Sequence, residues 1–304
     1  MDEEYNALRR GAAWLDLSAR ARFRVTGRDR ARLLHNVTSN DVKKLTPGSG
    51  CYAFLLTPQG RIQADLNILC FPDHFLIDTE PELREKAPHL ILKYKVADQV
   101  ELEDVTDSTF AIGLEGPGAA AALAAAGAPV PREPYAHVAW GEWTVANMSE
   151  SGEPGFRVFG EGRAPALFRD AGVPAVSSAV VRQVRIENGR PRFGEDIRET
   201  SLPQETGQLH GVSFQKGCYI GQEIVERIRA QGHVNKKLVR LAIESAEVPP
   251  SGTKVAMNGA EAGEITSAVY SVELGRVAAL GYVRVAYAEP GTVLDARGVE
   301  ARVV

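Results

Sequence analysis

The sequence predicts an α+β fold that ends in a small all-β module. Up to about residue 235, segments with strand periodicity and segments with helical periodicity are interleaved without the regular alternation of a parallel β/α sheet. After residue 236 helical periodicity stops, and short strand-like segments are separated by Gly, Pro, Ser and Asn. The chain has 304 residues, 44% hydrophobic and 24% charged, which is enough apolar mass for more than one core.

The first third of the chain predicts an antiparallel sheet with two helices. Residues 20–26 alternate as a strand does, and apolar positions 33, 34 and 37 share one helical face behind Asp29 as N-cap. Pro81 suits the first turn of a helix that runs to about residue 94. Strands joined by short Pro- and Gly-containing turns are predicted over 51–56, 61–71 and 74–78.

The middle of the chain repeats this mixture of strands and helices. GLEGPGAAAA (113–122) lacks the glycine order of a dinucleotide fingerprint and the Lys-Ser/Thr of a P-loop. We therefore interpret its glycines as the start of a helix that Gly127 closes. Strands are predicted over 99–105, 109–114, 136–147 and 155–160, and helices over 163–171 and 178–187.

These patterns divide the chain into residues 1–235 and residues 236–304. The first region is expected to hold two intertwined subdomains, one of which includes about 45–110. The second is expected to be a six-stranded barrel. Its strands are predicted over 236–244, 253–257, 263–271, 278–285, 292–296 and 300–304.

Charge and hydropathy narrow the possible partners. The net charge is −4, but residues 181–240 hold 11 basic and 7 acidic side chains, which favours an anionic small molecule over nucleic acid. No apolar run approaches the roughly 18 residues that cross a bilayer, so we expect no membrane insertion. The acidic start MDEEYNALRRGAAW does not fit a signal peptide, which indicates the cytoplasm. Without heptads or an obvious apolar stripe, a monomer is expected.

Three cysteines without a CxxC pair exclude a disulfide framework and a closed zinc site, so we expect reduced thiols and no permanent metal. Cys51 and Cys70 lie in apolar strands and are expected to pack in a core. Cys218 lies between Gly217 and Gly221, just before a predicted helix.

Cys218 is the candidate reactive residue. A helix N-terminus, together with Lys216 and with Arg227 if the loop folds back, would favour its thiolate. The alternative is a small buried residue that only shapes a glycine turn. His210 and His233 are candidate bases for the thiol.

Glu187 is the candidate ligand-binding carboxylate. It ends the apolar-periodic stretch AVVRQVRIE, followed by Asn188-Gly189. A carboxylate at a helix end that faces a cavity can accept paired N–H groups of a pterin- or guanine-like heterocycle. The alternative is an ion pair with Arg185 or Arg192.

The motif KGCYIGQE (216–223) gives these residues a family context. Together with RIENGRPRFGEDI (185–197) and LPQE (202–205), it resembles the signature of the YgfZ family. Those folate-binding proteins are related to the glycine cleavage T-protein, an aminomethyltransferase, and are implicated in the maturation or repair of iron–sulfur enzymes. Further similar blocks are LLHNVTSNDV (33–42), TPQGRIQAD (57–65), LEGPGA (114–119) and GEPGF (152–156).

The resemblance implies a multi-domain ring of antiparallel α+β units and a C-terminal β-barrel around a channel that takes tetrahydrofolate. It implies that Glu187 binds the pterin, with Arg185 beside it in the same block. It also implies that Cys218 is reactive. The supporting motif residues would be Lys216, Gly217, Tyr219, Gly221, Gln222, Glu223 and Arg227.

The function that follows is tetrahydrofolate binding in support of iron–sulfur cluster assembly or repair. One thiol does not hold a cluster, which normally takes four ligands, so contacts with client enzymes or assembly proteins would be transient. The alternative is a folate-dependent aminomethyltransferase or other one-carbon transferase. Residues 76–89 lack the asparagine–alanine block of the T-protein relatives, which favours the thiol-based function, with the protein as an accessory factor.

Overall fold

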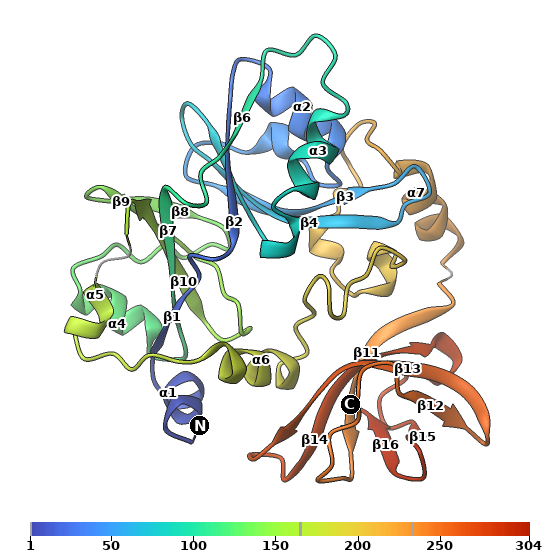
Figure 1. Ribbon diagram of the computed structural model, residues 1–304. Coiled ribbons are helices and arrows are strands. Elements are labelled where there is room, and N and C mark those ends of the chain that lie inside the picture. The colour runs from blue at the N-terminus through green and yellow to red at the C-terminus, as the bar shows by residue number, and fades with distance from the viewer. Residues whose placement is uncertain (1, 164–165, 233) are drawn as a thin grey trace.

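The computed structural model describes residues 2–163, 166–232 and 234–304. It contains two five-stranded sheets and a closed six-stranded barrel, arranged around a central region (Figure 1). This confirms the predicted α+β class and the C-terminal barrel. The first sheet has the order β1 (Ala13–Asp16), β7 (Thr109–Glu115), β10 (Gly155–Glu161), β9 (Trp143–Ala146), β8 (His137–Trp140). The second has the order β3 (Gly50–Leu56), β4 (Ile62–Cys70), β5 (Phe75–Thr79), β2 (Ala21–Thr26), β6 (Glu101–Asp104).

The two sheets exchange chain segments. Strand β1 pairs antiparallel with β7 of the first sheet, and the next strand, β2, pairs with β5 and β6 of the second sheet. The chain returns to the first sheet only with β7. The four residues between β1 and β2 therefore tie the sheets together, and charged side chains at their junction come from both.

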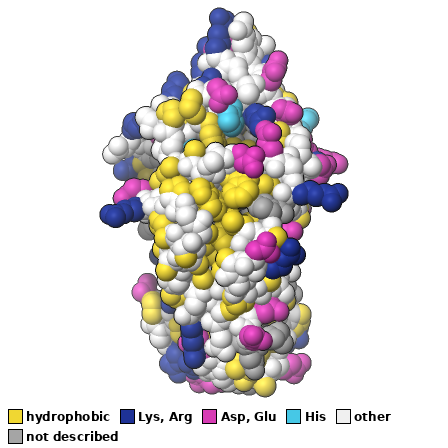
Figure 2. Space-filling view, turned by 90° about the vertical axis from the view of Figure 1, so that its left-hand side faces the viewer, with side chains coloured by type: hydrophobic (Ala, Val, Ile, Leu, Met, Phe, Trp, Pro, Cys, Tyr) yellow, Lys and Arg dark blue, Asp and Glu magenta, His cyan; other side chains and the backbone are white. Residues whose placement is uncertain are grey.

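Helices cover the outer faces of the two sheets (Figure 1). The helix α4 is rich in alanine and packs with the apolar side chains of the first sheet. Figure 2 looks onto this side of the molecule and shows hydrophobic side chains gathered across its middle. The described helices are α1 (Asp2–Arg10), α2 (Arg30–Val37), α3 (Lys86–Leu92), α4 (Ala119–Ala125), α5 (Leu167–Asp170), α6 (Ser178–Glu187) and α7 (Gln222–Gln231), with short 3₁₀ turns η1 (Val42–Lys44), η2 (Pro81–Leu83), η3 (Pro203–Glu205), η4 (Leu209–Gly211) and η5 (Val285–Tyr287).

Strand β4 shows how alternation positions the site. Ile62, Ala64, Leu66 and Ile68 are fully buried in the core beneath α2 and α3. Successive side chains of a strand point to opposite faces, so the intervening polar residues, Asp65 among them, point away from that core. The hydrophobic pattern that fixes the register of the sheet therefore also fixes where these polar groups lie.

The barrel closes through pairing of its first and last strands, β11 and β16. Its interior is a separate apolar cluster that includes Ile265 and Val283, both fully buried. The barrel contains all six predicted strands. They are β11 (Lys236–Ile243), β12 (Lys254–Met257), β13 (Ala260–Ser271), β14 (Arg276–Arg284), β15 (Val293–Asp295) and β16 (Glu300–Val303).

The helix α6 and the segment after it connect the three units. One face of α6 contacts β13 and β14 of the barrel, and the helix also contacts α1. The following residues, 188–221, contain only two short 3₁₀ turns. This segment crosses the centre of the molecule and brings basic side chains there.

Several predicted elements differ in detail. The predicted helix 81–94 is the turn η2 followed by α3, and the predicted strand 136–147 is the hairpin β8–β9, which turns at Gly141 with φ of +60°. Asp29 makes no cap hydrogen bond, because its carboxylate accepts the backbone N–H of Gln99. The predicted helix 163–171 includes residues 164–165, which lie outside the described part, and only α5 is found there. None of the described helices combines the length and the apolar character that crossing a bilayer requires.

Candidate functional site

A polar cavity of about 350 Å³ lies where the two sheets meet the segment after α6. Tyr52, Asp65 and Asn67 line it from β3 and β4. Residues 147–150 and 152–155 line it from the β9–β10 connection of the first sheet and the start of β10, and residues 190–192, Gln208 and His210 from the connecting segment. Its volume falls in the range of small-molecule sites, which is roughly 300–1,000 Å³.

Charged side chains form a network at the wall of this cavity. The guanidinium of Arg20 donates to Asp78 at 2.9 Å and to Glu80 at 2.6 Å. Arg157 pairs with Asp78 and, at 2.7 Å, with Glu150. Asp78 and Arg157 are each 1% exposed. Charges buried to this degree are tolerated because each has a partner.

Two carboxylates of the cavity titrate in opposite directions. Burial, and next the charge of Glu80, raise the pKa of Asp65 to about 7. Burial also acts on Glu150, but Arg20 and Arg157 overcome it and lower the pKa of that carboxyl to about 2. At neutral pH Glu150 is therefore ionised while Asp65 exchanges its proton readily. A split of this kind is how proteins assign acid–base roles to neighbouring carboxyl groups.

Aromatic side chains flank Asp65. The hydroxyl of Tyr52 donates to Asp65 Oδ2 at 2.7 Å, and the Tyr52 ring stacks on His210 with centroids 5.1 Å apart and planes 25° apart. Tyr135 also lines the cavity and adopts φ of +62°. A bulky residue in the left-handed region is strained, and such strain is concentrated at functional sites.

These residues fit a folate-like ligand. Asp65 and Asn67 offer the acceptors and donors that read the edge of a heterocycle, and the rings of Tyr52 and His210 offer a stacking surface. Arg190 offers a cation for a carboxylate. The cavity thus holds each type of group that a pterin with an acidic arm requires.

The Cys218 loop, residues 213–221, lies elsewhere and is anchored by Lys216. The ammonium of this buried lysine donates to the backbone carbonyls of Thr38 at 2.7 Å and Asn40 at 2.8 Å, and also to that of His35. It lies 4.8 Å from the centre of the Tyr219 ring. Burial lowers the pKa of Lys216 to about 8. Lys216 is therefore engaged with the end of α2, which gives it an anchoring position, and its predicted catalytic role gains no support from these contacts.

Cys218 itself is exposed. Among the described residues, those lining the central cavity do not include Cys218 or any other member of KGCYIGQE. Gly221 starts α7 with φ of +83°, and a Cβ there would lie 2.6 Å from the carbonyl oxygen of Thr57. The glycine is required because the loop lies directly on the β3–β4 turn.

Of the other motif residues, Tyr219 and Gln222 shape this loop. The backbone N–H of Tyr219 donates to Gln222 Oε1 at 3.3 Å, and Tyr219 is 7% exposed. Glu223 and Arg227 are exposed on α7, and a Cβ at Gly217 would meet open space. In the described part of the chain, Arg227 makes no ion pair or side-chain hydrogen bond. A catalytic role of the motif stays a prediction.

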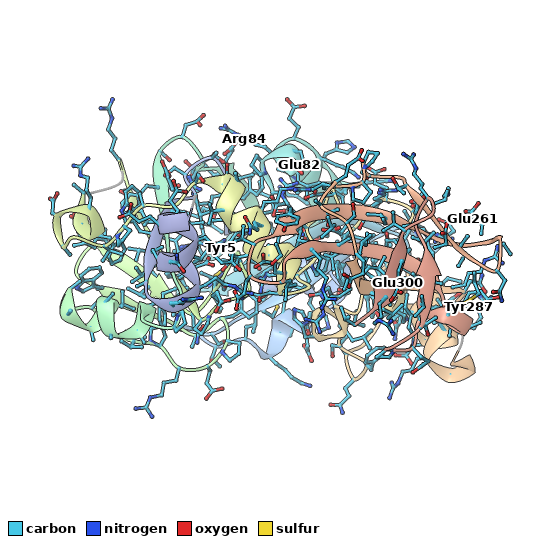
Figure 3. The ribbon with its side chains drawn as sticks, turned by 90° about the horizontal axis from the view of Figure 1, so that it is seen from below. Tyr5, Glu82, Arg84, Glu261, Tyr287 and Glu300 are labelled. Carbon is cyan, nitrogen blue, oxygen red and sulfur yellow. The ribbon has the colours of Figure 1, made fainter. Side chains whose placement is uncertain are left out.

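Glu187 is buried in a different network. Its carboxylate accepts hydrogen bonds from Tyr5 at 2.8 Å and Gln183 at 3.1 Å, and Arg9 lies 3.3 Å away. Tyr5 lies on α1 beside α6 (Figure 3). Of the described residues, the ones lining the central cavity do not include Glu187. Its role in pterin binding stays a prediction, and its partners in the structure are side chains of the protein.

Arg185 lines the cavity but is also fully engaged. It pairs with Glu195 at 2.5 Å and Asp196 at 2.6 Å. It also donates to the carbonyl of Arg190 at 2.7 Å. Arg185 therefore makes ion pairs, but not the predicted alternative pair with Glu187, whose ion-pair partner among the described residues is Arg9.

The two histidines predicted as candidate bases for the thiol are His210 and His233. His210 is at the cavity, eight residues from Cys218 in sequence, and His233 lies outside the described residues.

Cys70 is 6% exposed, and burial raises the pKa of the Cys51 thiol to about 12, as expected for core cysteines. No group of three or more His, Cys, Asp and Glu side chains among the described residues could hold a metal ion.

Asp65 and Arg190 are among the cavity residues that were not singled out from the sequence. Asp65 falls within the block TPQGRIQAD, but a polar residue at an alternate strand position is as typical of a solvent face as of a site. Arg190 is one of several basic residues of the segment 181–240. Only the position of the connecting segment over the sheet shows that both face one cavity.

Comparison with known proteins agrees with this architecture. Residues 1–156 match the GCVT N-terminal domain, and residues 236–304 match the glycine cleavage T-protein C-terminal barrel domain. The aminomethyltransferase of Rubrobacter xylanophilus is 30% identical over 293 residues, covering 92% of this chain and 78% of the relative. That of Chloroherpeton thalassium is 26% identical over 302 residues, covering 94% and 83%.

A solved structure extends the comparison to the fold. The glycine cleavage system aminomethyltransferase T from Bartonella henselae superposes with a TM-score of 0.89 at 23% identity, covering 99% of this chain and 87% of that one. Its sheets and barrel therefore follow the same arrangement. The chain belongs to the glycine cleavage T-protein family.

Proposed function

We propose that this protein binds tetrahydrofolate in the central cavity and, through Cys218, supports assembly or repair of iron–sulfur clusters in client enzymes of the cytoplasm. The observation that carries the proposal is the exposed Cys218 on a loop held by a buried lysine, within the motif KGCYIGQE. A thiol that faces outward from an anchored loop is placed to meet another protein.

Folate binding is supported by the family and by the cavity. The matched relatives are named aminomethyltransferases, and aminomethyltransferases of this kind use tetrahydrofolate. Asp65, Tyr52, His210 and Arg190 supply the polar, aromatic and cationic groups for such a ligand. When bound, tetrahydrofolate supplies a nitrogen that carries one-carbon units, and Asp65 can hold or release a proton at its carboxylate near neutral pH.

The thiol acts with a partner in this proposal. A cluster normally takes four protein ligands, and the described residues around Cys218 hold no group of three or more metal-binding side chains. Contact with a cluster is therefore shared with the client, and the protein is an accessory factor that releases its partner afterwards.

The test is complementation in the native host with the gene deleted. We expect Cys218→Ala to leave activities of four-iron enzymes as low, under oxidative stress, as the deletion does. Ser213→Ala, in the same loop, should restore them and serves as the matched control. Full activity with Cys218→Ala would remove the thiol from the function.

A second function is favoured by Asp65. A carboxyl group with a pKa near 7 in the cavity is suited to proton transfer at the nitrogen of a bound folate, as a one-carbon transferase requires. The assay is tetrahydrofolate-dependent methylene transfer from an aminomethylated lipoyl carrier protein. Turnover at enzymic rates that Asp65→Asn abolishes and Cys218→Ala leaves intact would establish the transferase and contradict the accessory role.

A further inference from the structure

Among the described residues, the central cavity contains one arginine, Arg190, that makes no direct ion pair, although its charge acts at longer range on the carboxylate of Glu150. The cavity arginines Arg20, Arg157, Arg185 and Arg192 each form ion pairs of 3.3 Å or less with carboxylates. In the part of the chain that the structure describes, Arg190 forms no ion pair and no side-chain hydrogen bond. Arg190 is thus an exception within one otherwise paired network.

The unpaired charge of Arg190 is costly to keep at this position. Arginine stays protonated in proteins, and its side chain here is only partly exposed. A guanidinium that loses water without a carboxylate at hydrogen-bond distance forfeits free energy. The carboxylate that its charge acts on, Glu150, is already paired directly with Arg20 and Arg157. The position therefore suits a cation that is completed by a group from outside the protein.

The backbone holds Arg190 in place. Its N–H donates to the carbonyl of Arg185 at 2.9 Å, and its own carbonyl accepts from the Arg185 guanidinium at 2.7 Å. Gly189 precedes it with φ of +73°, and Pro191 follows it. The main chain at Arg190 is therefore fixed on both sides, which holds the base of its side chain at the cavity.

The surroundings of Arg190 are aromatic. Burial, and next the positive charge of Arg190, lower the pKa of His210. The same charge acts on Tyr52 and Tyr135. The guanidinium therefore lies near the Tyr52–His210 stack, which offers a flat surface to a ring beside the cation.

We propose that Arg190 binds a carboxylate group that a ligand brings into the central cavity. The inference rests on the proposed function and deepens it. The carboxylate has two possible sources: the glutamyl arm of a folate, or a free amino acid that binds beside the ring. Both present the same planar anion, which a guanidinium binds with two parallel hydrogen bonds.

Titration calorimetry with the full chain tests this. The probes are tetrahydrofolate, 6-methyltetrahydropterin, which has the ring without the arm, and glycine. We expect Arg190→Gln to weaken tetrahydrofolate binding by about 10- to 100-fold, the scale of a lost hydrogen bond to a charged group. Binding of 6-methyltetrahydropterin should stay unchanged, and Arg190→Lys, which keeps the charge without the fork, should give an intermediate loss.

The matched control is Arg169→Gln, which removes an arginine from an exposed ion pair on α5, and thermal unfolding verifies that each variant is folded. Glycine binding that Arg190→Gln abolishes, with tetrahydrofolate binding intact, would assign the carboxylate to a free amino acid and also support the proposal. Unchanged binding of both tetrahydrofolate and glycine, or an equal loss for 6-methyltetrahydropterin, would overturn it. A wild-type protein that binds neither ring compound would overturn the proposed function itself.

Discussion

The central cavity and the Cys218 loop place chemistry in two different ways. The cavity is built from side chains on β3 and β4, on the β9–β10 connection and on the segment after α6, and nearly all of its charges are fixed by partners from several elements. The loop has no regular structure between Val212 and Gly221, and it is held by one buried lysine and by close glycine contact with the β3–β4 turn. The cavity is therefore suited to a small ligand that must be oriented, and the loop to a protein partner that must be reached.

The two regions are also indicated by different signals, a sequence motif for the loop and a position in the fold for the cavity. Cys218 attracts attention through a sequence motif, whereas Asp65 does so only through its position and its raised pKa. The motif alone says nothing about the cavity, and the cavity alone says nothing about the thiol. The following variants disturb one region at a time.

The largest effect is expected for Asp78→Ala at the wall of the cavity. This change leaves Arg20 and Arg157 without their shared carboxylate, and loss of one partner of a buried ion pair costs about 3–5 kcal/mol of unfolding free energy. Urea unfolding measures it. Glu244→Ala, which breaks an exposed pair with Arg276, is the control and should cost less than about 1 kcal/mol. Equal losses for the two variants would show that the cavity network stabilises the fold no more than a surface ion pair does.

The second effect is a dependence of stability on pH from Asp65. Because its folded pKa of about 7 lies above the unfolded value, the stability it contributes is fully present below about pH 4 and is lost as the pH rises through 7. Asn does not titrate. Relative to wild type, Asp65→Asn should therefore gain about 4 kcal/mol of unfolding free energy between pH 4 and pH 8.

Unfolding curves at a series of pH values test the Asp65 prediction. The surface variant Asp170→Asn is the control, and its free energy of unfolding should change with pH as that of wild type does. A parallel course for Asp65→Asn as well would contradict the raised pKa and, with it, the acid–base role of the cavity.

Lys216→Met should loosen the Cys218 loop. Methionine keeps the apolar stem but removes the ammonium from three backbone carbonyls, and we expect a loss of about 1–3 kcal/mol. Hydrogen exchange should accelerate in residues 213–221, while the amides of β4 stay protected. Lys237→Met, on an exposed part of the barrel, should change neither; unchanged exchange in the loop of Lys216→Met would show that the lysine is not its anchor.

The smallest effect on stability is expected for Cys218→Ala. Its side chain is exposed, so the free energy of unfolding should change by less than about 0.5 kcal/mol. Cys70→Ala removes a buried thiol and should cost more, about 1 kcal/mol. A large loss for Cys218→Ala would mean that the thiol stabilises the loop. Failure of this variant in the complementation test would then no longer show that the reactivity of the thiol is needed.

Strong local patterns in the sequence predicted most of the fold. The barrel strands follow from short β-rich segments between breaking residues, and strand β4 follows from its alternation. The helix α1 and strand β1 were not predicted. In the polar stretch DEEYNALRR of α1, the buried side chains among those described, Glu3–Arg10, are Tyr5 and Leu8. Their burial depends on contact with α6, which no local pattern reports.

The site was predicted less well than the fold, for a physical reason. Cys218 could be recognised because a motif is contiguous, whereas the cavity is assembled from β3, β4, the first sheet and the segment after α6. Glu187 has the chemistry of a ring-binding carboxylate, but tertiary contacts direct it to Tyr5 and Arg9. The partners of a charged side chain are set by the fold, and they decide whether the charge is free for a ligand.

Binding of tetrahydrofolate to matched variants of the two regions tests the central claim most directly. When wild type, Asp65→Asn and Cys218→Ala are titrated with tetrahydrofolate, Cys218→Ala should bind it with the affinity of wild type. Asp65→Asn should bind about tenfold more weakly, because it loses a carboxylate acceptor in the cavity. Loss of binding in Cys218→Ala with full binding in Asp65→Asn would contradict the assignment of the ligand to the cavity and of the thiol to a partner.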